Sequence, residues 1–349
     1  MAEETTKEPT KKLQEEFTIQ ARHFHGYSPL YERLSLGIAG DPELLALVAR
    51  SPRHNRSLLF LAAVQYLLLQ GATHPLAAYY PSLSAGPITD ADPYPLFRAF
   101  CQEHHDQILS LIMTRHVQTN EVRRCVGLLP AFGQVAQRTG GQPLYLVEIG
   151  ASAGLNLLWD RYRYRYGKEL ELGPADSPVL LECEIQGDKT PPVSLDFPQV
   201  AARVGIDLSP IDVRDPDQVL WLRALIWPEH RRRVEILEKA VQIAQSDPPR
   251  LVAGDAVERL PDVLASCPSE SVPCVFHSFM IGQLPRDSRE RLFQLLADVA
   301  AECPLYHVSF EWPHTEHPQI LLTQYEKGEK TETLLAHCNA HGHWIEWLS

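Results

Sequence analysis

One short stretch constrains the fold more than any other part of the chain. Residues 144–148 form an apolar run of strand length that ends in Glu148, residues 150–154 are a turn of small residues, and residues 155–160 are an apolar segment of helix type. A strand, a tight loop and a helix N-terminus in this order present backbone N–H groups and a positive dipole end to a ligand. Gly150 permits a positive φ and a close approach of that ligand. We therefore expect a ligand site at this loop.

The composition excludes several classes of protein. A formal net charge of −12 disfavours a general nucleic-acid-binding protein, which needs a basic patch. The dense basic run 231–233 lies in a Glu-rich helical segment and is typical of a solvated helix face. Seven scattered cysteines without a CxxC pair indicate free thiols in a reducing cytosol, and no metal site is expected. The N-terminus lacks the apolar core of a signal peptide, and the apolar run 58–69 is too short for a bilayer, so we expect a cytoplasmic protein without a membrane partner.

The pattern of residues divides the chain into a tail and two domains. Residues 1–12 are polar and predict a disordered tail, and residues 13–140 carry helical signals that predict a helical N-terminal cap domain. From 141 to 349 strands alternate with helices, which is the mark of an α/β domain with a parallel sheet. An insertion at about 161–200, in which 161–166 and 179–185 pair, predicts a small antiparallel unit. The last two apolar segments, 331–338 and 342–348, predict a hairpin.

Polar residues follow four of the expected strands of the α/β domain. Glu148, Asp207, Asp255 and His277 each stand at the C-terminal end of a strand. The carboxyl ends of parallel strands meet at one edge of the sheet, where ligands of open α/β folds bind. Carboxylates accept hydrogen bonds strongly, so these acids suit ribose hydroxyls or an adenine amino group.

This ordered series resembles the class I S-adenosylmethionine-dependent methyltransferases. The resemblance implies an α/β fold with a Rossmann-like sheet and an antiparallel C-terminal hairpin, S-adenosylmethionine as cofactor, and methyl transfer to a small-molecule substrate. It places Glu148 and Gly150 in the loop under the cofactor, Asp207 at the ribose and Asp255 beside the adenine. The expected cofactor-binding residues are Asn120, Arg123, Glu148, Gly150, Ala151, Ser152, Gly154, Asn156, Asp207, Asp255 and Ala256.

Two features depart from the common pattern. Ser152 stands where a GxGxG loop has its middle glycine. Glu148 and Asp207 are 59 positions apart, whereas a glycine loop and its ribose acid are usually about 20 apart. We attribute the excess to the insertion at 161–200. In the alternative, residues 162–166 are themselves the second strand, but no acid follows them directly.

Three further features admit both a structural and a functional interpretation. In the polar block 118–123, Thr119 or Asn120 can cap the helix that follows, or Arg123 can pair with the carboxylate of the cofactor. His277 is the candidate catalytic residue, a proton acceptor, and a structural histidine is the alternative. The tyrosines at 162, 164 and 166 form either a packed aromatic face or a surface that stacks on bases.

Two other functions remain open from the sequence. A nicotinamide-dependent oxidoreductase shares the glycine loop but needs its sixth strand parallel. A non-catalytic sensor would keep the fold and the cofactor, and Ser152 favours it.

A closer resemblance covers nearly the whole chain. Several sequence blocks together resemble the bacterial domain of unknown function 2332. These blocks are 28–31, 118–122, 148–156, 160–164, 205–207 with Trp227-Pro228, and 341–344.

Overall fold

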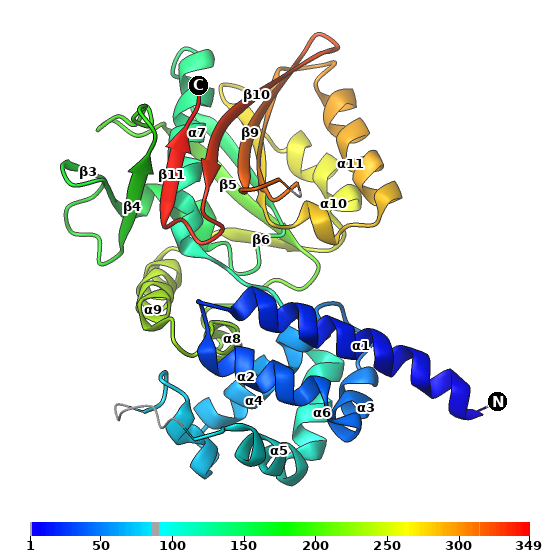
Figure 1. Cartoon of the computed structure of the whole chain (residues 1–349). Helices are drawn as coiled ribbons and strands as arrows, with labels where there is room; N and C mark the ends of the chain where they lie inside the picture. Colours follow the sequence, from blue (N-terminus) through cyan, green and yellow to red (C-terminus); the bar gives the residue numbers. More distant parts are fainter. Residues whose placement is uncertain (1, 85–90, 314) are drawn as a thin grey trace. The chain divides into compact units, whose positions relative to one another are not determined.

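The computed structural model describes residues 2–84, 91–313 and 315–349, and the chain separates into two compact units (Figure 1). Unit 1 comprises Met1–Thr119 and Asp215–Glu235, and unit 2 comprises Asn120–Arg214 and Ile236–Ser349. The sequence predicted a domain boundary near residue 140, whereas the first boundary between the units lies between Thr119 and Asn120. The helix Cys125–Arg138 packs against the sheet of unit 2 and is therefore part of that unit. Phe132 of that helix packs 5.1 Å from Phe276 of the sheet, ring centre to ring centre.

Unit 1 is helical, as the sequence predicts for its N-terminal part. Its helix α1 extends back to Ala2, where the sequence predicted a disordered tail over 1–12, and Met1 lies outside the described residues. Ser28 and Asp41 accept hydrogen bonds at the starts of the next two helices, each of which begins with a proline. The elements are α1 (Ala2–Phe24), α2 (Pro29–Ala39), α3 (Pro42–Ala49), α4 (Arg56–Leu69), η1 (Pro75–Tyr79), α5 (Tyr94–Glu103), α6 (His105–Thr114) and α8 (Pro216–Ala224).

The segment Asp215–Glu235 is an integral part of the helical unit although it is remote in sequence. Trp221 is 1% exposed in the apolar core of this unit. The side-chain amide of Gln65 donates to the backbone oxygen of Ile226 at 2.7 Å. Glu229 accepts hydrogen bonds from the backbone N–H of Leu30 at 2.9 Å and the hydroxyl of Ser28 at 2.6 Å, so it caps α2.

Unit 2 is built on one mixed sheet of strand order β3-β2-β4-β11-β10-β9-β8-β7-β1-β5-β6. The strands β6, β5, β1, β7 and β8 are mutually parallel, and β9, β10 and β11 continue as antiparallel neighbours. The predicted parallel core and terminal hairpin are confirmed, whereas β9 was not foreseen. The strands are β1 (Leu144–Ile149), β2 (Arg163–Tyr166), β3 (Leu170–Leu172), β4 (Leu180–Gln186), β5 (Val200–Asp207), β6 (Arg250–Ala253), β7 (Val272–Ser278), β8 (Leu305–Glu311), β9 (Gln319–Glu326), β10 (Glu329–Cys338) and β11 (Trp344–Trp347).

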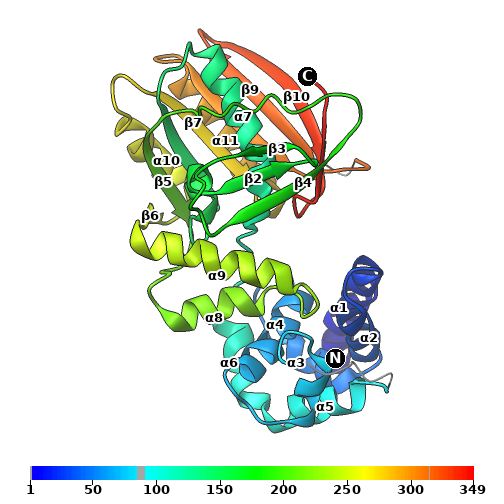
Figure 2. The ribbon, with the colours of Figure 1, turned by 90° about the vertical axis from the view of Figure 1, so that its left-hand side faces the viewer.

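Helices cover both faces of this sheet (Figure 2). Helix α7 packs against β4, β8, β9 and β10, and α10 and α11 pack together under Val147 and Val275. Neighbouring residues of a strand point to opposite faces, so Phe276 faces α7 while Val275 faces α10 and α11. The remaining elements are η2 (Val122–Arg124), α7 (Cys125–Arg138), η3 (Leu155–Arg161), α9 (Arg231–Ser246), which continues from unit 1, α10 (Ala256–Ala265), η4 (Ile281–Gln283) and α11 (Arg286–Val299).

The insertion at about 161–200 differs from its prediction. β2 pairs with β4 in parallel and only with β3 in antiparallel orientation, so the expected antiparallel pairing of 161–166 with 179–185 is wrong. Parallel pairing needs a crossover between the two strands, and β3 lies in it. Through β4 and β11 the insertion extends the main sheet.

The tyrosines of the insertion form a packed aromatic face. Their rings are at most 1% exposed, which contradicts the alternative of a surface that stacks on bases. Each hydroxyl donates to a backbone oxygen at 2.6 Å, so the strand fixes η3 and the first turn of α7. The pairs are Tyr162 with Leu155, Tyr164 with Trp159, and Tyr166 with Val126.

Candidate functional site

The candidate site lies at the carboxyl edge of the parallel strands in unit 2. β1 lies between β5 and β7, so the chain leaves β1 toward one side of the sheet and later returns to the other. Ligands of open α/β sheets bind where the strand order reverses in this way. The ends of β1, β5, β6 and β7 therefore define the candidate site.

The loop after β1 has the backbone shape that its glycines predict. Gly150 has a φ of +73°, and the N–H groups of Gly150 and Ala151 donate to the backbone oxygen of Ile206 at 2.8 and 3.2 Å. A Cβ built on Gly150 would lie 2.6 Å from Cγ of Met280. The sequence predicted that a ligand would lie close to Gly150, and in this structure the side chain of Met280 occupies that space.

Ser152 adopts the conformation usually given to glycine in such a loop. Its φ is +52°, a left-handed backbone that costs an L-residue about 1–2 kcal/mol. Its N–H donates to Oδ2 of Asp207 at 2.8 Å, and its backbone oxygen accepts from the N–H of Ile211 at 3.1 Å. The departure from GxGxG therefore leaves the left-handed turn in place.

Gly154 brings the start of η3 close to β6. Its φ is +69°, and a Cβ there would lie 2.7 Å from Pro249 and 3.0 Å from Leu251. Only glycine fits this approach.

Asp207 lies beside the glycine loop, as predicted. β5 pairs directly with β1, so the alternative in which residues 162–166 form the second strand of the core is wrong. Besides Ser152, its carboxylate accepts a hydrogen bond from the backbone N–H of Ser209 at 2.9 Å. Asp207 thus ties the β1 loop to the end of β5.

Asp255 and Ala256 stand at the start of α10, directly after β6. Oδ1 of Asp255 accepts the backbone N–H of Val257 at 2.8 Å and caps the helix. The N–H of Gly254 donates to the backbone oxygen of Asp207 at 2.9 Å. The two strand-end acids therefore lie at neighbouring positions of the same edge.

Glu148 is a buried acid with an unused acceptor. It is 1% exposed, and its Oε1 accepts a hydrogen bond from Asn156 at 3.3 Å. Oε2 has no hydrogen-bond partner among the residues that the structure describes. Burial raises the pKa of Glu148 well above its usual value, against the opposing effects of Asn156 and Arg124. Asn156 in turn accepts from the thiol of Cys125 at 3.4 Å.

The polar block before α7 organises the loops at this edge. Oδ1 of Asn120 accepts the backbone N–H of Leu155 at 3.1 Å and so ties the block to the start of η3, whereas η2, which directly follows the block, is capped by Glu121. Arg123 donates to the backbone oxygens of Glu182 at 2.7 Å and Gly342 at 3.5 Å. These contacts join β4 to the loop before β11.

Arg124 is the basic residue at the end of β7, and sequence reasoning missed it. Its guanidinium donates to the backbone oxygen and hydroxyl of Ser278 at 3.3 and 3.2 Å and lies 4.3 Å from the ring centre of Phe279. It also donates to the backbone oxygen of Ala340 at 3.2 Å. The pair Arg123-Arg124 was the available signal, but a sequence does not show which of two adjacent side chains faces the edge.

His277 is buried on the opposite face of the sheet from Glu148. Glu148 pairs in register with Phe276, so the next residue points toward α10 and α11. The imidazole is 0% exposed, and its Nδ1 lies 2.7 Å from Oε1 of Glu311. The Nε2 atom has no hydrogen-bond partner in the described part of the chain. This burial agrees with the structural alternative, and the role of His277 as a proton acceptor stays a prediction.

Glu311 is the centre of a small polar network that the sequence did not predict. Besides His277, its Oε1 accepts the backbone N–H groups of Met280 at 2.7 Å and Ile281 at 3.0 Å. Burial raises the pKa of Glu311, but the hydrogen bonds from His277 and the two amides outweigh it and leave the pKa below its usual value. The network thereby fixes the loop that carries Met280 over Gly150.

Comparison with known proteins identifies the family. The family model described as an uncharacterized protein conserved in bacteria (DUF2332) matches residues 14–347. The chain belongs to DUF2332. No curated protein and no solved structure matches it. The family resemblance expected from the sequence blocks is confirmed.

Backbone strain in this DUF2332 protein is concentrated at the same edge. Of the described non-glycine residues, four have a positive φ, and two of these, Ser152 and Phe279, follow β1 and β7. Strained residues persist where the surroundings fix them, and they gather at binding sites. The described residues contain no group of three metal-ligating side chains and no helix long and apolar enough to cross a membrane.

Proposed function

We propose that the carboxyl edge of β1, β5, β6 and β7 binds S-adenosylmethionine and that the protein transfers its methyl group to a small molecule. The observation that carries the proposal is the free Oε2 of Glu148, 99% buried at the end of β1 beside a left-handed glycine loop. A buried acceptor without a partner is costly, and the ammonium group of a ligand would supply the missing donor.

The strand order supports this proposal over a nicotinamide-dependent oxidoreductase. That alternative needs a parallel strand beside β8, whereas β9 is antiparallel to it. An antiparallel strand at this position is the feature that the class I methyltransferase resemblance implies for the end of the sheet.

The residues at the edge fit an adenosyl ligand. The carboxylate of Asp207, held by the backbone N–H groups of Ser152 and Ser209, lies at the position that the resemblance gives to the ribose acid. Oδ2 of Asp255 is available for an adenine amino group, because only Oδ1 caps α10. The ligand must displace the side chain of Met280 from Gly150, which a flexible methionine permits.

The cation assigned to the cofactor carboxylate changes from Arg123 to Arg124. Both arginines donate to backbone oxygens, and Arg124 would exchange its hydrogen bonds with Ser278 for the cofactor carboxylate. Arg124 lies at the end of β7 and contributes to the electrostatics of Glu148. A guanidinium pairs with a carboxylate through two parallel N–H groups.

Methyl transfer requires of the protein mainly that it align the acceptor with the methyl group of the cofactor. Bound S-adenosylmethionine supplies an electrophilic methyl group, and the acceptor must lie in line with it. The strand-end acids orient the adenosyl part, and the loop with Met280 excludes water. No step of this proposal uses His277, which lies on the other face of the sheet.

One observation favours a non-catalytic binding protein as the second candidate. The residue expected to accept a proton, His277, is fully buried. An O–H or N–H substrate would need another base, whereas a sensor would need none. Incubating the purified protein with S-adenosylmethionine and a pool of thiol metabolites separates the methyltransferase from the sensor. A thiolate can accept a methyl group without a base, so methylated thiols support the methyltransferase and their absence supports the sensor.

Isothermal titration tests the cofactor assignment first. We expect S-adenosylmethionine and S-adenosylhomocysteine to bind with a Kd on the order of 10 µM, and NAD not to bind. Absence of binding of both adenosyl compounds by folded protein contradicts the proposal. Binding of NAD alone supports the oxidoreductase.

A further inference from the structure

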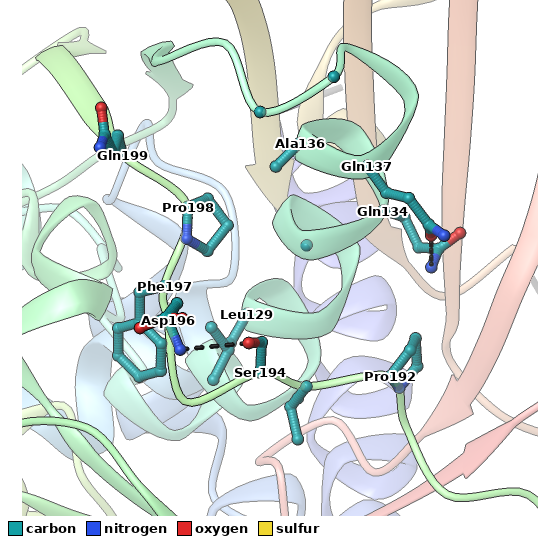
Figure 3. A pocket seen from close by; sticks show the side chains of 14 residues that line it. Leu129, Gln134, Ala136, Gln137, Pro192, Ser194, Asp196, Phe197, Pro198 and Gln199 are labelled. Atoms are coloured by element: carbon teal, nitrogen blue, oxygen red, sulfur yellow. Dashed lines mark hydrogen bonds between the residues drawn. The ribbon is translucent and has the colours of Figure 1, made fainter.

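A pocket lies at the opposite edge of the sheet from the candidate site in unit 2 (Figure 3). It has a volume of about 520 Å³, within the range of small-molecule sites. One wall is α7, another is the turn at Gly140 and Gly141 before β1, and the third is the segment 192–199 before β5. The N–H of Leu144 donates to the backbone oxygen of Gln199 at 2.7 Å, which places this pocket at the amino ends of the strands.

The lining of the pocket carries acceptors and a negative charge. None of its described lining residues is Lys, Arg or His. Asp196 is exposed, and its carboxylate has no ion-pair or hydrogen-bond partner among the described residues. The C-terminal end of α7, with Gln134 and Gln137, forms the wall opposite this segment (Figure 3). A helix C-terminus carries a partial negative charge, so the site favours a cation.

The floor of the pocket is apolar. Phe197 is half-buried, and its ring packs 5.5 Å from Trp159 and 6.0 Å from Tyr164, centre to centre. Leu129 of α7 lies beside it (Figure 3). An aromatic face near a carboxylate attracts ammonium groups through its quadrupole.

A helical glycine lies where the segment 192–199 crosses α7. Gly133 lies on the α7 wall, and a Cβ built on it would be 3.5 Å from the backbone oxygen of Pro192. The segment 192–199 therefore crosses α7 at its smallest side chain, with Ser194 and Asp196 on the segment that faces the helix (Figure 3).

We propose that this pocket binds a primary ammonium carried on a small apolar body. Asp196 would pair with the ammonium, and Phe197 and Leu129 would contact the apolar part. A neighbouring pocket of about 610 Å³ does not share this character, because both Arg138 and Glu326 line it. The proposal is independent of the proposed function, since no residue of the glycine loop lines the pocket.

Titration of the full-length protein with a matched pair of probes tests the site. Benzylamine is charged at neutral pH, and benzyl alcohol is its neutral counterpart. We expect benzylamine to bind with a Kd on the order of 1 mM and benzyl alcohol at least about tenfold more weakly. Equal affinity for the two probes, or no binding of benzylamine, overturns the proposal.

Two variants locate the binding. Asp196→Asn should weaken benzylamine at least about tenfold, with no loss for benzyl alcohol. The control Asp188→Asn changes an exposed acid of the same connection that does not line the pocket, and it should bind like the wild type. An unchanged affinity in Asp196→Asn, with the thermal melt unchanged, overturns the assignment.

Discussion

The buried acid at the end of β1 makes a pH prediction at the scale of one residue. Because burial raises the pKa of Glu148, the native state keeps a proton above pH 4.5 that the unfolded state has lost. The native state then binds more protons than the unfolded state, so stability falls as the pH rises toward the raised pKa. Each pKa unit of that increase costs about 1.4 kcal/mol.

Glu148→Gln should remove this dependence while keeping the shape and the hydrogen bond with Asn156. We expect the free energy of unfolding of the variant to match the wild type near pH 4.5 and to exceed it increasingly up to pH 8, measured by denaturant titration. A difference between the two proteins that stays constant over this range would show that Glu148 is ionised in the native state.

Gly150 provides a second prediction, on ligand binding. Gly150→Val places a branched side chain against Met280 in the space the proposed ligand needs, and we expect S-adenosylhomocysteine affinity to fall at least about 100-fold in isothermal titration. Gly328→Val is the matched control. Gly328 also has a positive φ, +83°, but a Cβ there meets nothing within 4 Å. The control should lose about 1–2 kcal/mol of stability and no affinity.

Retained affinity in Gly150→Val, with the control behaving as expected, would mean that the ligand binds away from this loop.

At the scale of an element, Glu311 joins the end of β8 to the loop after β7. Its removal leaves the imidazole of His277 and the amides of Met280 and Ile281 without an acceptor. We expect Glu311→Ala to lose about 3 kcal/mol of stability and the hydrogen-exchange protection of those two amides. Glu316→Ala is the control, because its side chain is 90% exposed on the following loop.

The same network predicts a dependence on acid. The pKa of Glu311 is lowered in the native state, so its contribution is complete above the usual value of 4.5 and is lost as the pH falls through the lowered value. Glu311→Gln should therefore flatten the stability curve below pH 4.5. A wild-type curve as flat as that of the variant would contradict the ionised Glu311 that the network requires.

The sequence predicted the elements whose signals are local. The loop at Gly150 and the acid Asp207 at the end of β5 follow from patterns within a few residues, and the structure places them together. Pairing between distant strands has no local signal, so the parallel pairing of β2 with β4 and the presence of β9 were missed. Side-chain direction has no local signal either, so the sequence did not show that Arg124 reaches the end of β7 or that His277 points toward α10 and α11.

At the scale of the whole molecule, the two units are interleaved in sequence. Unit 1 is completed by Asp215–Glu235, which the chain supplies only after β1 to β5 of unit 2. The core of unit 1 thus contains Trp221, and α2 is capped by Glu229. Loss of a buried tryptophan alone costs about 3–5 kcal/mol, a large part of the stability of a domain.

The helical unit should therefore not fold from its N-terminal segment alone. We expect the fragment 1–119 to show a weak helical circular dichroism signal and no cooperative thermal melt. The fragment lacks the backbone oxygens to which Gln65 donates, and it lacks the buried side chain of Trp221. Adding the peptide 215–235 in trans should restore a cooperative melt, whereas the same peptide with Trp221→Ala should not. A cooperative melt of 1–119 by itself would show that Asp215–Glu235 only covers a core that is already complete.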